Sequence, residues 1–234
     1  MQTLEIVEII SKWLLSYARK SGLNGFVVGV SGGIDSAVSS TLAAKTSLPT
    51  LCMEMPIHQS ANQVQRSTQH IQWLKKTHQN VEHITVNLTS MFDDFVDTNS
   101  HYSADRTKEL ALANTRARLR MTTLYYHAAI KEYLVIGTGN KIEDFGVGFF
   151  TKYGDGGVDL SPIADLTKTE VYTLGKHLGI INQILTAPPT DGLWGDNRTD
   201  ESQLGASYSE LEWAMTFSGA ENKITERKKE VLKI

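Results

Sequence analysis

Hydrophobic and polar residues follow two periods along this chain. Residues 4–20 repeat apolar side chains at three- and four-residue steps, which predicts an amphipathic helix. The run 26–30 is apolar and predicts a buried strand, and a helix is expected to follow at about 34–45. Further strands are predicted at 49–54, 81–86 and 133–137, and further helices at 60–76 and 107–131.

This order of elements predicts the fold class. Strands that alternate with helices indicate right-handed crossover connections between parallel strands. We therefore expect an α/β fold in which helices flank a doubly wound, mostly parallel sheet of the Rossmann-like kind. No internal repeat, low-complexity tract or clear boundary interrupts the pattern, so a single domain is expected over residues 1–234.

Beyond residue 137 the periodicity weakens. Residues 145–157 contain five glycines and show neither period, and residues 186–206 form a second long irregular stretch. Between them, a capping box at 167–170 predicts the start of one more helix, and a final helical pattern begins near Ser207. Long irregular segments inside a compact domain usually carry function or are disordered.

Composition and charge narrow the class of protein. The chain has 234 residues, 41% of them hydrophobic, and a net charge of −3 at pH 7. This charge predicts no broad basic surface for nucleic acid or an anionic membrane, although a polyanionic substrate needs only local cations. Cys52 is the single cysteine, so no disulfide forms within the chain, and its apolar surroundings predict a buried thiol. Neither a secretory signal nor a membrane-spanning apolar run is found, so we expect a cytoplasmic protein.

A glycine-rich segment between a predicted strand and a predicted helix is the central chemical signal. At such a junction, backbone N–H groups and the helix dipole converge on an anion. Glycines let the backbone approach phosphate oxygens closely, and serine hydroxyls add donors. The spacing is neither that of a Walker A loop nor that of the dinucleotide-binding Gly-x-Gly-x-x-Gly pattern. The residues of this segment are Gly29, Val30, Ser31, Gly32, Gly33, Ile34, Asp35 and Ser36.

Asp35 indicates what the segment binds. A carboxylate inside a phosphate cradle repels its ligand unless a divalent cation lies between them. The segment therefore predicts a magnesium-bound polyphosphate. The alternative is an ordinary glycine turn in which Asp35 only starts a helix, and this alternative leaves both serines and both glycines unexplained.

The segment resembles the Ser-Gly-Gly-x-Asp-Ser signature of the ATP pyrophosphatases, which cleave ATP between the α and β phosphates. Further motifs follow in order along the chain, and with them residues 20–215 resemble the NAD synthetase family. These motifs are residues 114–121, 137–143, 148–159, 165–168 and 187–192.

The resemblance implies an ammonia-dependent ligase. ATP adenylates the nicotinate carboxylate of deamido-NAD, and ammonia then displaces AMP, which gives NAD, AMP and pyrophosphate. It also implies Mg²⁺ as cofactor, ATP as co-substrate and a homodimer. The chain length leaves no room for the glutaminase domain of glutamine-dependent relatives. Relatives continue beyond the last helix to a His-Lys pair that contacts deamido-NAD, and we expect this chain to lack that tail.

The resemblance also assigns roles to single residues. Asp35, Lys152 and Lys168 are the implied catalytic residues. Asp35 and Glu143 are the implied magnesium ligands, although spacing does not exclude Asp144 in place of Glu143. Beside residues 29–36, the implied ATP contacts are Thr138, Lys168 and Thr190. The implied deamido-NAD contacts are Arg118, Lys152 and Asp159, and the 145–157 loop is expected to act as a lid.

Several alternatives remain open from the sequence. Lys168, as the second residue of a capping box, can point into water, and Arg116 and Arg120 can form a solvated basic face. Glu143 can be an exposed glutamate at a helix start. For the whole chain, the alternatives are another amide ligase of the pyrophosphatase class, such as a GMP synthetase subunit, or a nucleotide-binding module without catalysis.

Overall fold

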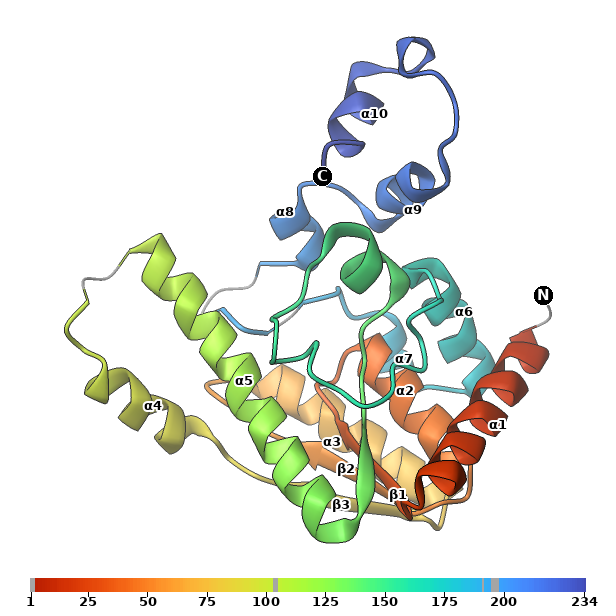
Figure 1. The fold of residues 1–234 in the computed structure, drawn as a ribbon, viewed down its shortest axis with the longest axis vertical. Coiled ribbons are helices and arrows are strands. Elements are labelled where there is room, and N and C mark those ends of the chain that lie inside the picture. The colour runs from red at the N-terminus through yellow and green to blue at the C-terminus, as the bar shows by residue number, and fades with distance from the viewer. Residues whose placement is uncertain (1–2, 103–104, 191, 195–197) are drawn as a thin grey trace.

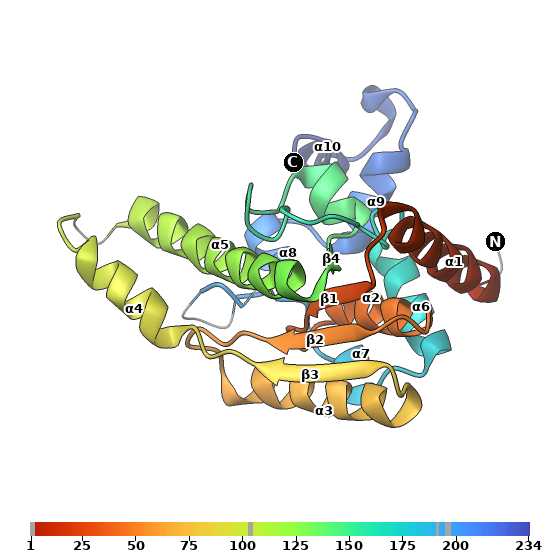
Figure 2. The same ribbon diagram turned by 60° about the horizontal axis from the view of Figure 1, so that its bottom comes forward.

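The computed structural model describes residues 3–102, 105–190, 192–194 and 198–234. Its centre is a parallel sheet in the order β3-β2-β1-β4, as Figures 1 and 2 show. The expected α/β fold with a parallel sheet is confirmed, and each predicted strand is present. The strands are β1 (Gly25–Gly29), β2 (Thr50–Glu54), β3 (Val81–Thr85) and β4 (Tyr133–Ile136).

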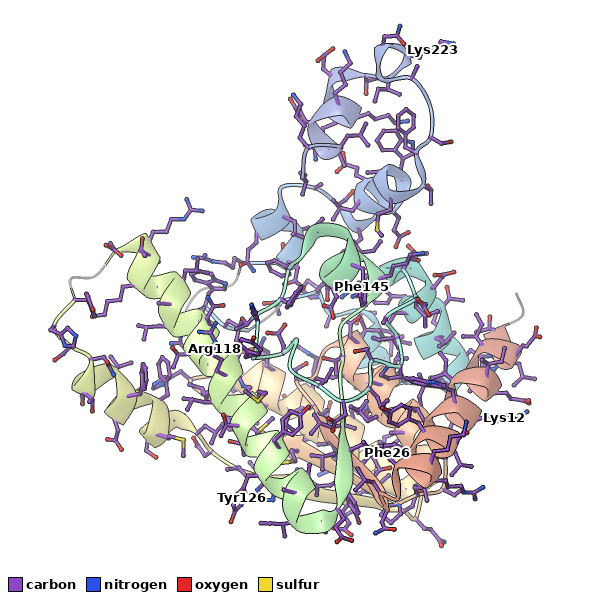
Figure 3. All side chains as sticks on the ribbon, in the orientation of Figure 1. Lys12, Phe26, Arg118, Tyr126, Phe145 and Lys223 are labelled. Carbon is purple, nitrogen blue, oxygen red and sulfur yellow. The ribbon has the colours of Figure 1, made fainter. Side chains whose placement is uncertain are left out.

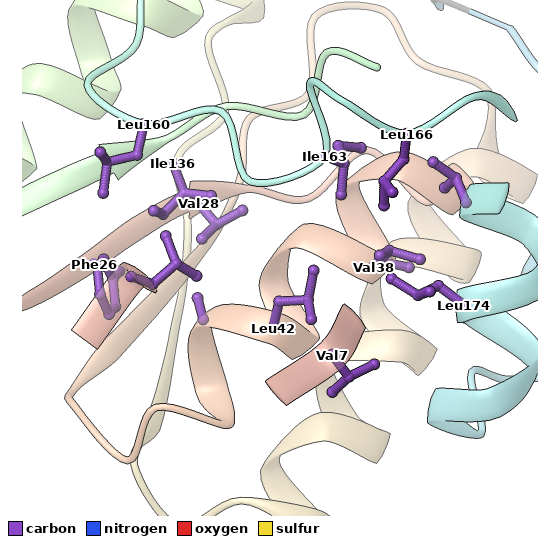
Figure 4. Close-up of a cluster of buried hydrophobic side chains, with 14 of the residues drawn as sticks. Val7, Phe26, Val28, Val38, Leu42, Ile136, Leu160, Ile163, Leu166 and Leu174 are labelled. Carbon is purple, nitrogen blue, oxygen red and sulfur yellow. The ribbon is translucent and has the colours of Figure 1, made fainter. Parts of the chain in front are cut away.

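Helices cover both faces of the sheet, because successive strand residues point to opposite sides. Phe26 and Val28 of β1 face a cluster that also draws side chains from the helices on one side, as Figure 4 shows. Val27 of the same strand belongs to the cluster on the other side. Helices of the first side are α1 (Thr3–Ser21), α2 (Ile34–Ala44), α3 (Ala61–Thr77) and α6 (Lys168–Leu178), and those of the second are α4 (Thr89–Thr98) and α5 (Arg106–Lys131).

The structure differs from the expected elements in three places. Helix α4 is absent from the prediction, because only one of its residues, Phe92, is fully buried and its pattern is short. The 145–157 segment, expected to be irregular, begins inside a π-helix, η1 (Lys141–Val147). The side chain of Asn140 accepts hydrogen bonds from two backbone N–H groups of η1, which stabilises this helix although it contains a glycine. Within 186–206, α8 (Asp200–Leu204) forms around a capping box at Thr199.

The remaining helices lie towards the C-terminal end and complete the chain. Among them, α9 packs against η1 through an apolar cluster that contains Ile142, Tyr208 and Leu211. Within the described ranges, no helix combines the length and the apolar character needed to cross a bilayer. The helices are α7 (Asn182–Leu185), α9 (Tyr208–Thr216), η2 (Glu221–Lys223) and α10 (Glu226–Val231).

Candidate active site

A cleft opens at the carboxyl edge of the sheet, where ligands bind in open α/β folds. All eight residues of the glycine-rich segment 29–36 line it, together with the ends of β2 and β4. Thr138, which follows β4, and Thr190 also belong to its walls, so the residues expected to contact ATP lie around a single space. The Thr190 hydroxyl donates to the carbonyl oxygen of Arg198 at 3.2 Å, which fixes its position in the wall.

The segment that links β1 to α2 is held by its own serines. The Ser36 hydroxyl accepts from the backbone N–H of Ser31 at 3.2 Å and donates to the carbonyl oxygen of Gly33 at 3.1 Å. Gly32 has a φ of +83°, and a β-carbon there would lie 2.8 Å from the carbonyl oxygen of Gln63. Glycine is therefore required at this position by conformation and by space.

Three charged side chains meet beside this segment. The ammonium of Lys168 lies 2.6 Å from Oδ2 of Asp35 and 2.8 Å from Oε1 of Glu143. Lys168 opens helix α6 behind the Thr167 capping box and is only 2% exposed, so the alternative in which it points into water is wrong. Asp35 comes from the first turn of α2 and Glu143 from the first turn of η1.

Polar neighbours fix both carboxylates. The side-chain amide of Asn140 donates to Oδ1 of Asp35 at 3.0 Å, while its oxygen accepts from the backbone of η1. The hydroxyl of Tyr208 donates to Oε1 of Glu143 at 2.6 Å. Glu143 is therefore a half-buried, paired group, which contradicts the alternative of an exposed helix-start glutamate.

Burial and charge shift the titration of this cluster. Burial disfavours the charged form of Lys168, yet the carboxylates of Asp35 and Glu143 raise its pKa above the ordinary value. Burial raises the pKa of Asp35, and the Lys168 ammonium opposes this rise. Burial, with further contributions from Asp155, Glu143 and Asp35, raises the pKa of Asp144 to about 7. The cluster is thus an acidic site whose negative charge is offset in part by one lysine.

The donor set suits a magnesium ion that also binds phosphate. Asp35 and Glu143 each offer one oxygen to a single cation, here the Lys168 ammonium, so both can face one metal position. In the part of the chain that the structure describes, no group of three or more acidic, histidine or cysteine side chains is arranged around a metal position. Magnesium typically takes one or two carboxylates and completes its shell with water and phosphate oxygens, which two carboxylates fit.

The residues expected to bind deamido-NAD lie outside the walls of this cleft. Arg118, labelled on α5 in Figure 3, donates to the carbonyl oxygen of Lys152 at 3.2 Å, and both side chains are exposed. Asp159 accepts hydrogen bonds from the backbone N–H of Val135 at 2.8 Å and from the Tyr125 hydroxyl at 3.0 Å. Arg118 and Lys152 are therefore neighbours, and they lie beside the walls of the cleft rather than in them.

The expected lid is a folded loop in this structure. The hydroxyl of Thr151, which is buried, donates to the side chain of Asn114 on α5 at 2.7 Å, and its backbone N–H donates to Asp155 at 3.0 Å. Phe149 lines the cleft, whereas Phe150 and Tyr153 are exposed. The loop thus contacts the cleft through one aromatic side chain and presents two others outward.

The sequence alone assigns no function to four residues near the site. Asn140 lies within the 137–143 motif and is an ordinary helix N-cap, but its contact with Asp35 joins positions 105 residues apart, and Tyr208 contacts Glu143 across 65 residues. Arg116 stacks at 4.1 Å from the Phe92 ring centroid, and Arg120 donates to the carbonyl oxygen of Met55 at 3.1 Å. The alternative of a solvated basic face is therefore wrong for both arginines.

Fold and site together define the class of this protein. A parallel sheet with a serine- and glycine-rich phosphate segment after β1, and a half-buried carboxylate inside that segment, is the arrangement of an ATP-binding α/β protein of the pyrophosphatase type. The NAD synthase family model matches residues 6–233, so the chain belongs to the NAD synthase family.

Individual relatives agree with this assignment. The NH(3)-dependent NAD(+) synthetase of Carboxydothermus hydrogenoformans is 40% identical over 219 residues, which cover 92% of this chain and 87% of that protein. The protein of the same name from Methanosarcina acetivorans is 37% identical, with 87% and 77% covered.

Two experimental structures are also similar. A structure described as NMN synthetase from Francisella tularensis is 32% identical with a TM-score of 0.89, and the match covers 100% of this chain and 92% of that one. An NH3-dependent NAD synthetase from Campylobacter jejuni is 28% identical with a TM-score of 0.73, and the match covers 92% and 82%.

Proposed function

We propose that this chain is an ammonia-dependent NAD synthetase that amidates deamido-NAD at the expense of ATP. The observation that carries the proposal is the convergence of Asp35, Glu143 and Lys168 beside the phosphate segment, in a chain of the NAD synthase family. A nucleotide-binding module without catalysis needs the segment but has no use for a second carboxylate and a buried lysine.

The reaction forms and breaks two bonds. A carboxylate oxygen of deamido-NAD attacks the α-phosphorus of ATP, and the bond from that phosphorus to the bridging oxygen of pyrophosphate breaks. Ammonia then attacks the carbonyl carbon of the adenylate, AMP leaves, and one proton is released. Attack of this kind needs alignment and charge neutralisation more than covalent help from the protein.

The residues of the cleft supply those two requirements. The backbone N–H groups of residues 31–36 and the hydroxyls of Ser31 and Ser36 hold the pyrophosphate part of ATP. Asp35 and Glu143 would hold magnesium, which neutralises phosphate charge when bound. The Lys168 ammonium then turns from the two carboxylates to the phosphates, where Thr138 and Thr190 also contact ATP. A preorganised set of charges stabilises the transition state without reorganisation of solvent.

The acceptor binds beyond the phosphate end. Arg118 and Lys152, which are exposed and joined by a hydrogen bond where α5 meets the 148–157 loop, supply two cations for the anionic part of deamido-NAD. Asp159 orients the adjoining Tyr125 hydroxyl and contacts the substrate from the same region. Phe149, the aromatic side chain of the loop that lines the cleft, then excludes water from the adenylate.

A homodimer agrees with the apolar surface of the protein. Exposed apolar side chains of α4 and α5 form a face that a second copy can cover, and α5 also carries Arg118. Sedimentation at several concentrations tests the dimer, which Ile130→Glu is expected to dissociate. The exposed apolar residues of this face are Met91, Phe95, Leu110, Tyr126 and Ile130.

We also propose a cytoplasmic location and a single domain over the described residues.

A second acceptor is favoured by one comparison. The Francisella tularensis structure, with its TM-score of 0.89 over the whole of this chain, is described as an NMN synthetase. The matching reaction would amidate nicotinate mononucleotide, which has the same carboxylate but lacks the adenylate half. The phosphate end of the cleft would serve either acceptor in the same way.

One assay tests the function and separates the two acceptors. Purified protein is incubated with Mg²⁺, ATP and ammonium, with deamido-NAD or nicotinate mononucleotide as acceptor, and pyrophosphate and the amide product are measured. We expect a higher kcat/KM with deamido-NAD. Preference for the mononucleotide would establish the second candidate, and ATP binding without turnover for either acceptor would refute both.

A further inference from the structure

Tyr208 lies within the charged cluster, although the proposed function gives it no role. It is the first residue of α9 and is only 6% exposed. Helix α9 packs on η1, the helix that carries Glu143, through Ile142 and Leu211. The position of the Tyr208 side chain is therefore fixed by the same apolar cluster that fixes η1.

One side chain contacts both an expected metal ligand and the expected phosphate-binding cation. The Tyr208 hydroxyl donates to Oε1 of Glu143 at 2.6 Å and lies 3.3 Å from Oδ2 of Asp200. The Lys168 ammonium lies 4.7 Å from the centroid of the Tyr208 ring. At this distance the electron-rich face of a phenol ring attracts an ammonium ion.

The hydrogen bond from Tyr208 to Glu143 matters for the metal because Glu143 shares one oxygen between two donors. The Lys168 ammonium and the Tyr208 hydroxyl both bind the same oxygen, Oε1. When Lys168 turns to the phosphates of ATP, the Tyr208 hydroxyl still holds Oε1 and prevents rotation of the carboxylate. A hydrogen bond to an ionised acceptor is short and strong enough to do so. A metal ion bound by Glu143 would then meet a carboxylate with a fixed orientation.

We propose that Tyr208 is a positioning residue for the adenylation step, whose hydroxyl orients Glu143 for the metal and whose ring supports Lys168. The inference rests on the proposed roles of Glu143 and Lys168. Partners that orient metal ligands in this way are as much a part of a metal site as the ligands themselves.

Two variants separate the two contacts. Tyr208→Phe keeps the ring and removes the hydroxyl, whereas Tyr208→Leu removes both. The matched control is Tyr17→Phe, which removes an exposed phenol hydroxyl from α1, far from the cluster along the chain. Two quantities are measured for each protein: the Mg²⁺ concentration that gives half-maximal pyrophosphate release, and the Kd of Mn²⁺ by electron paramagnetic resonance with a non-cleavable α,β-methylene ATP analogue.

We expect Tyr208→Phe to raise both quantities by about tenfold, the lower end of the range for loss of a partner that orients a ligand, while kcat at saturating Mg²⁺ changes by less than about threefold. Tyr208→Leu is expected to raise the KM for ATP as well, even at saturating metal, because Lys168 loses its support. Tyr17→Phe is expected to match the wild type in every measurement.

Two results would overturn the inference. One is an unchanged Kd for Mn²⁺ in a folded Tyr208→Phe protein. The other is a loss of activity in this variant that is equal at all Mg²⁺ concentrations and accompanied by a lower Tm, which would indicate a packing role. Failure of the proposed function is distinct from both results. In that case the wild-type protein forms no amide product, while the Kd of Mn²⁺ still tests the role of Tyr208.

Discussion

Asp35, Glu143 and Lys168 reach one small volume from three distant parts of the chain. Two carboxylates this close repel each other unless a cation lies between them, and in this structure the cation is the Lys168 ammonium. We propose that a metal ion at the same place would release the lysine towards the phosphates, so that one cation exchanges for another when ATP binds.

Asp35→Asn tests the charge at this position. The amide keeps the shape of the side chain but removes a metal ligand and half of the negative charge. We expect kcat/KM to fall by about 100-fold or more, the range seen when one group that stabilises developing charge is removed. Asp94→Asn, at an exposed acid on α4, serves as control and is expected to keep wild-type rates. Wild-type turnover in folded Asp35→Asn would remove Asp35 from the metal site.

His70 is a buried titratable residue on α3, away from the charged cluster. The Ser40 hydroxyl donates to the carbonyl oxygen of Ala37 at 3.1 Å, so it accepts from Nε2 of His70 at 3.0 Å. Nδ1 then carries the free lone pair, and among the described residues it has no hydrogen-bond partner. Burial lowers the pKa of His70 to about 4, because a proton on Nδ1 would find neither water nor an acceptor.

This pKa makes the stability of the protein depend on pH. The unfolded chain takes up a proton below about pH 6.5 and the folded chain only near pH 4, so acidification through this window favours unfolding. We expect His70 to remove about 3 kcal/mol from the free energy of unfolding by pH 4. Urea unfolding at several pH values should give a flatter profile for His70→Gln, whereas His177→Gln, at an exposed histidine of α6, should keep the wild-type slope. Identical slopes in all three proteins would refute the assignment.

At the scale of elements, the junction between β1 and α2 requires glycine at a position where a side chain would clash with the backbone of α3. Gly32 and Gly22 both have a positive φ, of +83° and +71°, but only Gly32 has backbone atoms close to the position of a β-carbon. Gly22 has nothing within 4 Å of that position. Substitution of Gly22 therefore tests the cost of the backbone conformation alone, whereas substitution of Gly32 also displaces the phosphate segment.

Gly32→Ala is expected to displace the segment from the start of α3 and to raise the Kd of ATP by about tenfold or more, as loss of aligned N–H donors removes the anion site. Gly22→Ala is expected to cost about 1–2 kcal/mol of stability, the usual penalty for a side chain in this conformation, with no change in ATP affinity. Isothermal titration with ATP and thermal unfolding measure both effects. Equal ATP affinities in the two variants would contradict the assigned role of the segment.

Elements that depend on local sequence could be predicted, and elements that depend on distant contacts could not. Strands β1, β2 and β4 are almost completely buried and rich in apolar residues, so the sequence predicts them and their parallel arrangement, whereas the edge strand β3 is only partly buried. The phosphate segment was equally predictable because its chemistry is local. Helix η1 was not, because its stability comes from the Asn140 side chain and from packing on α9. The contact of Tyr208 with Glu143 arises only when the chain folds, and no local pattern encodes it.

The whole molecule divides the expected reaction between two surfaces. The phosphate end is enclosed at the carboxyl edge of the sheet, where the segment 29–36 and the Lys168 cluster meet. The exposed side chains of Arg118 and Lys152 lie where α5 meets the 148–157 loop, beside the walls of the cleft. This division suits a substrate with a long anionic body whose carboxylate alone must reach the α-phosphate.

The most direct measurement follows the carboxylate oxygen. Deamido-NAD carrying ¹⁸O in its nicotinate carboxylate is converted with ATP and ammonium, and the phosphorus-containing products are analysed by mass spectrometry. If the carboxylate attacks the α-phosphorus, one ¹⁸O atom appears in AMP and none in pyrophosphate. Label in orthophosphate with ADP as the other product, or unlabelled AMP beside newly formed NAD, would contradict adenylation at this site.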